Sequence, residues 1–179
     1  MNKLLFLVGM SGSGKSYLRQ KVSNRFGPKM NTISPDDLRK KILGDIDNQD
    51  ENNRIFQIAY SQTLKSLQDY EITYFDATGL NWSRNKKQIE SYVNELDIKV
   101  YIIFMMDSED LELCKERVMG DILIGKDRSN VPEEVLETQH QKFNQCLKNA
   151  LNDKTLPDNW NIILYDGNFE SLIGELKNG

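Results

Sequence analysis

The octapeptide Gly9-Met10-Ser11-Gly12-Ser13-Gly14-Lys15-Ser16 decides the fold of this chain. It matches the phosphate-loop pattern Gly-x-x-x-x-Gly-Lys-Ser/Thr, lies directly after the apolar run 4–8, and leads into a helical pattern that starts at Lys15. The glycines let successive backbone N–H groups close around an anion, and the helix N-terminus adds its positive dipole end. A Gly/Ser-rich turn without a ligand is the alternative. We expect a nucleoside triphosphate here, with Lys15 on the β- and γ-phosphates and Ser16 on Mg²⁺; the expected nucleotide-binding residues are Gly9, Ser11, Gly12, Ser13, Gly14, Lys15 and Ser16.

The composition is that of an ordinary soluble domain. The chain has 179 residues, 39% of them hydrophobic and 28% charged, and a net charge of −4. An acidic protein does not grip long duplex DNA through a basic face, so any nucleic-acid contact must be local. The longest apolar stretch, 100–106, is too short to span a bilayer. We expect a cytoplasmic protein without a membrane partner, and the two cysteines have no metal-ligand spacing.

Apolar runs alternate with amphipathic ones along the chain, which predicts an α/β fold in one domain, 1–179. The central parallel sheet has about five strands, with helices on both faces. The expected strands are 4–8, 31–34, 72–76, 98–105 and 161–165. The expected helices are 15–26, 35–43, 51–69, 82–95, 108–119, 132–151 and 169–177, with N-caps at Ser34, Asn81 and Ser108. A lid is expected at about 118–131.

A second motif, Ser34-Pro35-Asp36-Asp37-Leu38-Arg39, follows the second expected strand. Ligands of open α/β sheets bind at the carboxyl ends of the strands, so Asp36 would face the same crevice as the phosphate loop. A carboxylate there can accept the proton of an acceptor hydroxyl. Arg39, three residues on along the same helix face, could bind an anionic group of the acceptor. Helix capping is the competing role for both acids.

Two further motifs point to the same crevice. Asp76 ends the third strand and could brace Arg39 or lie near Mg²⁺, and Thr78 in the same turn is a candidate acceptor contact. Arg117 and the lid cations Lys126 and Arg128 could stabilise charge on the transferring phosphoryl group. Arg84, in a basic cluster with Lys86 and Lys87, is the remaining candidate acceptor contact.

Together these four motifs resemble, over residues 4–145, the kinase domain of the bacteriophage polynucleotide kinase family. The resemblance implies a three-layer P-loop kinase fold and transfer of the ATP γ-phosphate to the 5′-hydroxyl of DNA or RNA. It implies that Asp36 is the general base, that Arg39 meets the acceptor's 3′-phosphate, and that Arg128, or alternatively Lys126, is the lid cation. Pro35 departs from the polar or basic residue usual in that family, and no Asp-x-Asp-x-Thr phosphatase motif is present.

Two other functions stay open at this point. One is a kinase of a small hydroxylated metabolite, such as a sugar acid, nucleoside or antibiotic, and the other is a nucleotide-dependent switch or binding module. Arg39 and the Arg84 cluster discriminate the first, and Asp36 the second. His140, Trp82 and Tyr74 are expected to serve in packing or at the surface. The sequence makes no prediction of oligomeric state.

Overall fold

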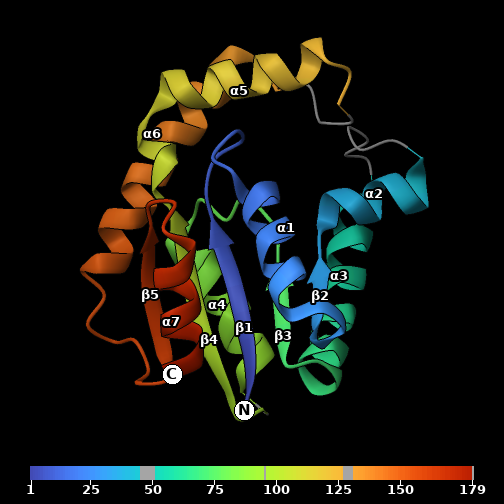
Figure 1. Ribbon diagram of the computed structural model, residues 1–179, viewed down its shortest axis with the longest axis vertical. Helices are drawn as coiled ribbons and strands as arrows, with labels where there is room; N and C mark the ends of the chain where they lie inside the picture. Colours follow the sequence, from blue (N-terminus) through green and yellow to red (C-terminus); the bar gives the residue numbers. More distant parts are fainter. Residues whose placement is uncertain (45–50, 95, 127–130, 179) are drawn as a thin grey trace.

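The computed structural model describes residues 1–44, 51–94, 96–126 and 131–178. Strands and helices alternate along the chain (Figure 1). The strands are β1 Asn2–Val8, β2 Met30–Ile33, β3 Ile72–Phe75, β4 Ile98–Met105 and β5 Trp160–Tyr165. The helices are α1 Lys15–Phe26, α2 Pro35–Leu43, α3 Asn52–Asp69, α4 Trp82–Val93, α5 Leu111–Leu123, α6 Glu133–Leu151 and α7 Phe169–Asn178, with 3₁₀ turns η1 Gly27–Lys29 and η2 Met106–Glu109.

The five strands form one parallel sheet in the order β2-β3-β1-β4-β5. The central strand, β1, pairs Phe6 with Phe75 of β3 on one side and with Ile102 of β4 on the other. Parallel neighbours need a crossover connection, and each crossover here contains a helix. All five strands therefore end at the same edge, where the phosphate loop follows β1.

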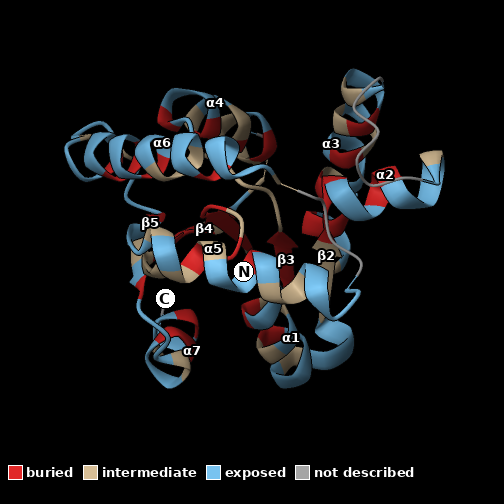
Figure 2. Cartoon of the chain, turned by 90° about the horizontal axis from the view of Figure 1, so that it is seen from above, coloured by how far each residue is buried: buried red, intermediate tan, exposed pale blue. Residues whose placement is uncertain are grey.

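The sheet is covered on both faces, which confirms the expected three layers (Figure 2). Alternate residues of β1 point to opposite faces. Leu4, Phe6 and Val8 pack with α3, α4 and α6, whereas Leu5 and Leu7 pack with α1 and α7. A third, smaller core joins the phosphate loop to α5 and α6 through Met10, Cys114, Val118 and Leu136.

The expected strands and helices all occur, with ends that differ by a few residues. Ser34 and Asn81 cap α2 and α4 as predicted, each accepting the N–H three residues on. The prediction for Ser108 is wrong: Asp110 caps α5, and Ser108 is buried in η2. The first residues of the expected lid, 118–123, are the last residues of α5.

An ion pair fastens α4 to the connection between α6 and β5. The Asp153 carboxylate accepts hydrogen bonds from the Trp82 indole and from Lys86, both at 2.9 Å. Its other oxygen accepts from the backbone N–H and hydroxyl of Thr155. These charge-assisted bonds hold the pKa of Asp153 well below its usual range, Thr155 contributing most.

Candidate functional site: a phosphate-loop cleft at the edge of the sheet

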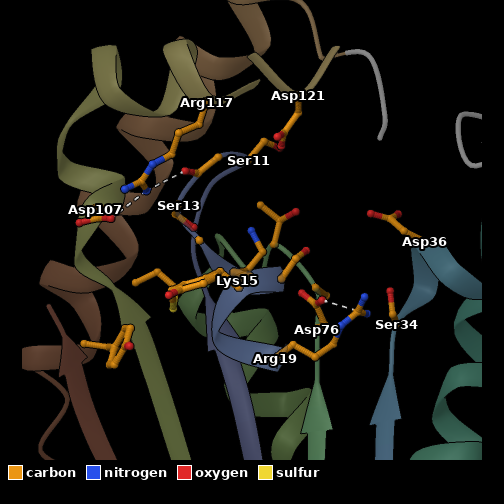
Figure 3. A pocket seen from close by; sticks show the side chains of 18 of the residues that line it. Ser11, Ser13, Lys15, Arg19, Ser34, Asp36, Asp76, Asp107, Arg117 and Asp121 are labelled. Atoms are coloured by element: carbon orange, nitrogen blue, oxygen red, sulfur yellow. Dashed lines mark hydrogen bonds and ion pairs between the residues drawn. The ribbon is translucent and has the colours of Figure 1, made fainter. Parts of the chain in front are cut away.

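A cleft of about 770 Å³ opens at the carboxyl ends of the strands. Figure 3 shows Arg117 and Asp107 on one side of it, Asp36 and Ser34 on the other, and Lys15 with Asp76 between them. The cleft is lined by the phosphate loop, by residues that follow β2, β3, β4 and β5, and by the end of α5 with Lys126. Of the residues that the sequence assigns to the site, Arg39 and Arg84 are the described ones that neither line this cleft nor belong to its loop.

The phosphate loop has the geometry of an anion cradle. Gly12 and Gly14 have φ angles of 83° and 94°, in the left-handed region that favours glycine. A Cβ on Gly12 would also lie 2.5 Å from the carbonyl oxygen of Cys114. The Lys15 ammonium folds back over the loop and donates to the carbonyls of Gly9 at 2.7 Å and Met10 at 2.9 Å. The loop and Lys15 therefore fit a bound polyphosphate.

Side chains from the second half of the chain hold this loop in place. The N–H of Met10 donates to the Ser108 hydroxyl at 3.0 Å, and the N–H of Ser11 donates to the Gln139 side-chain oxygen at 2.8 Å. Arg117 donates to the carbonyl of Gly12 at 3.1 Å and pairs with Asp107 at 2.8 Å. Sequence reasoning placed Arg117 near the phosphates but missed Gln139 and Asp107, which belong to no local motif.

Three carboxylates line the part of the cleft that extends from Lys15 to α2 (Figure 3). Asp36 and Asp37 come from the first turn of α2, and Asp76 directly follows β3. Asp76 is the most buried of the three, with its side chain 11% exposed. Burial raises the pKa of Asp76, and the neighbouring charges of Lys15 and Arg19 oppose that rise.

Arg19 of α1 takes the position at Asp76 that the sequence suggested for Arg39. Its guanidinium lies 2.9 Å from Asp37 and 3.5 Å from Asp76. Arg39 instead pairs with Asp36 and donates to the Asn52 side chain at 3.0 Å, and it is only 6% exposed. The expectation that Asp76 braces Arg39 is thus wrong. Sequence reasoning missed Arg19 because this residue lies after the phosphate-loop motif and belongs to no motif of its own.

A row of contacts leads outward from Asp36. Arg39 and Arg84 each lie over the Phe56 ring, 5.8 Å from its centre. Arg84 is exposed in the first turn of α4, six residues after Thr78 in the sequence. Thr78 itself lines the cleft. Lys86 of the same cluster is tied to Asp153, so it belongs to the scaffold.

The remaining candidates fall into two groups. Lys126 lines the cleft and pairs with Asp121 at 3.0 Å, whereas Arg128 lies outside the described residues. Tyr74 and Trp82 are buried, as expected for core residues. Both cysteines are buried, which raises the pKa of Cys114 to about 11 and that of Cys146 to about 12.

Solved structures with the same fold include kinases of different substrates. A chain of a Pnkp1/Rnl/Hen1 RNA repair complex matches with a TM-score of 0.66 and 19% identity, over 87% of this chain and 51% of that one. A fungal RNA kinase matches with a TM-score of 0.57 and 16% identity, over 98% of this chain and 82% of that one. A gluconokinase from Sinorhizobium meliloti 1021 matches with a TM-score of 0.52 and 18% identity, over 98% and 89%. This chain thus spans about half the length of the RNA-repair chain.

No curated protein matches the sequence significantly. Within the described ranges, no helix has the length and apolar character needed to cross a membrane. A family model described as an AAA domain matches residues 4–146, which hold the phosphate loop, the three carboxylates and the segments that fasten the loop. The chain therefore belongs to this AAA domain family and has the fold of a P-loop kinase.

Proposed function

We propose that the chain is an ATP-dependent kinase that phosphorylates the 5′-hydroxyl of a nucleic-acid end. One observation carries the kinase part of this proposal. A phosphate loop with its lysine and a set of strand-end carboxylates face each other across a single cleft. A donor triphosphate and an acceptor hydroxyl could meet there, which phosphoryl transfer requires.

The residues divide into a donor half and an acceptor half. The loop N–H groups and Lys15 would hold the triphosphate of ATP, and the exposed Ser16 hydroxyl would bind Mg²⁺. Asp36 would accept the proton of the acceptor hydroxyl, so that its oxygen attacks the γ-phosphorus as the bond to ADP breaks. The ion pair with Arg39 would hold the Asp36 carboxylate in one orientation for this task. Arg117 of α5 would complete the donor half, together with a lid cation, Arg128 or alternatively Lys126.

The nucleic-acid acceptor is supported by the row Arg39–Phe56–Arg84 next to Asp36. An exposed arginine stacked on an aromatic ring can bind the phosphate of an incoming strand, and a local contact of this kind suits an acidic protein. The RNA repair complex and the fungal RNA kinase among the solved structures agree with this acceptor class at the level of fold. Thr78 and Asp76 would contact the terminal nucleoside.

A second acceptor class, a small hydroxylated compound without a phosphate, is favoured by one specific observation. The acceptor half is lined by three carboxylates, those of Asp36, Asp37 and Asp76. Arg19 is the single arginine among the described residues that line this half, and it pairs with Asp37 and Asp76. This excess of carboxylates repels an anionic acceptor.

Transfer of radiolabelled γ-phosphate from ATP with Mg²⁺ separates these possibilities. The acceptors are 5′-hydroxyl DNA and RNA oligonucleotides, a nucleoside 3′-monophosphate, plain nucleosides and sugar acids. We expect label on the oligonucleotides. Label on plain nucleosides or sugar acids alone would overturn the nucleic-acid acceptor and keep the kinase. ATP binding without transfer to any acceptor would indicate a switch or binding module.

A further inference from the structure

The phosphate loop is completed by a residue 128 positions away in the sequence, Gln139 of α6. Its side-chain oxygen accepts the hydrogen bond of the Ser11 N–H at 2.8 Å. Ser11 is the third residue of the loop and lies between β1 and α1, so its N–H takes part in the regular hydrogen bonds of neither element. A half-buried N–H without a partner would cost free energy, so Gln139 fixes the shape of the loop at this residue.

Gln139 is itself held rigidly by its neighbours on α6. Leu136, one turn before it, is buried with Met10 and Cys114. Phe143, one turn after it, is buried edge-on against Phe104 of β4. Residues three and four apart lie on the same face of a helix, so both anchors share the face of Gln139. The amide therefore reaches the loop from a fixed point.

The adjacent residue, His140, supports the loop by a parallel route. Its Nδ1 lies 2.9 Å from the carbonyl oxygen of Ser108, and the hydroxyl of Ser108 accepts the N–H of Met10. Two consecutive residues of α6 thus fix two consecutive N–H groups of the loop, one directly and one through η2. This arrangement ties the donor site to α6, the helix that follows the lid.

We propose that Gln139 is a positioning residue for the donor nucleotide, which shapes the phosphate loop before ATP binds. The inference rests on the donor half of the proposed function and is independent of the acceptor. A loop that is already in its binding shape loses less conformational entropy on binding, so removal of the amide oxygen weakens ATP affinity. Gln139 touches neither reacting group and affects the reaction only through Ser11.

The test compares Gln139→Leu with the wild type and with Gln141→Leu, an exposed position on the same helix. Hydrogen exchange of the Ser11 amide reports the bond directly, and the Met10 amide, bonded to Ser108, is an internal reference. ATP affinity is measured by calorimetry, and KM and kcat with the acceptor identified by the transfer assay. Gln139→Asn, which withdraws the oxygen by one methylene, serves as a second variant that keeps the side chain polar.

We expect faster exchange at Ser11 but not at Met10, and ATP binding about tenfold weaker, as the loss of one hydrogen bond predicts. The KM of the acceptor should not change, and Gln141→Leu should behave as the wild type. Unchanged ATP affinity in both Gln139 variants, or equal loss of protection at Met10 and Ser11, would overturn the proposal. Failure of the wild type to bind ATP would instead refute the proposed function.

Discussion

At the scale of single residues, Asp36 and Asp37 form a natural matched pair. They are neighbours in the first turn of α2, and both line the cleft. Asp36→Asn removes the proposed base, so we expect kcat to fall by about 10²–10⁴-fold without a change in ATP affinity. Asp37→Asn breaks an exposed pair with Arg19 and should cost less than about tenfold. Steady-state kinetics and ATP titration check both; equal losses would show that neither acid is the base.

Asp76 should reveal a conflict between stability and activity. Its pKa is raised by burial, so the folded protein binds its proton more tightly than the unfolded chain does. The ionised form therefore costs stability once the pH rises above the usual carboxyl range. Asp76→Asn should raise Tm at neutral pH, lose this advantage below about pH 4, and reduce phosphoryl transfer. Thermal unfolding from pH 3.5 to 8 checks this; a lower Tm at neutral pH would mean that the pairing with Arg19 outweighs burial.

Arg84 tests the nucleic-acid acceptor at the level of one side chain. Arg84→Glu should raise the KM of a 5′-hydroxyl oligonucleotide about tenfold and weaken its salt dependence, with KM for ATP unchanged. Lys87→Glu makes the same charge change at an exposed position three residues further along α4. Kinetics at two salt concentrations compare the variants. Equal effects of the two substitutions would show a general charge effect and no contact at Arg84.

At the scale of elements, the bonds between Asp153 and α4 should govern local stability. The carboxylate has a depressed pKa, so its stabilising effect is present above the usual carboxyl range and is lost progressively as the pH falls from that range toward the depressed pKa. We expect Asp153→Asn to lower the free energy of unfolding by about 2 kcal/mol at neutral pH. The difference should shrink toward pH 3, and catalysis should be unaffected. Denaturant unfolding at both pH values checks this; a gap that is the same at both would contradict the ion pair.

The elements themselves were predictable from local patterns. The apolar run 4–8, the cap at Ser34 and the proline at position 35 each fix an element through short-range chemistry. Ser108 misled because a serine before a helix has the same local pattern whether it caps the helix or, as here, turns inward to bind Met10. The end of the helix before the expected lid was equally ambiguous. Gly120 is typical of a helix end, but here it lies within α5.

At the scale of the whole molecule, the position of the cleft could be predicted from the alternation of strands and helices, but the contacts between its side chains could not. A parallel sheet brings all strand ends to one edge, which places Asp36 and Asp76 near the phosphate loop. The contacts of Arg19 and Gln139 depend on how α1 and α6 pack onto the sheet. Such contacts join distant segments, and no spacing in the sequence encodes them. The position of Arg39 outside the cleft likewise depends on packing between elements, through its contacts with Asn52 and Phe56 of α3.

The central position of β1 in the sheet has a consequence for folding during synthesis on the ribosome. This strand is made before both of its partners, β3 and β4, which are completed only at Phe75 and Met105. At roughly 5–20 residues per second, the apolar segment 4–8 must wait several seconds before both of its edges can pair. During that time it is an unprotected strand in a growing chain, open to chaperones and to wrong partners. The hydrogen bond from the Ser11 N–H of the phosphate loop to Gln139 can form only after α6 has been synthesised.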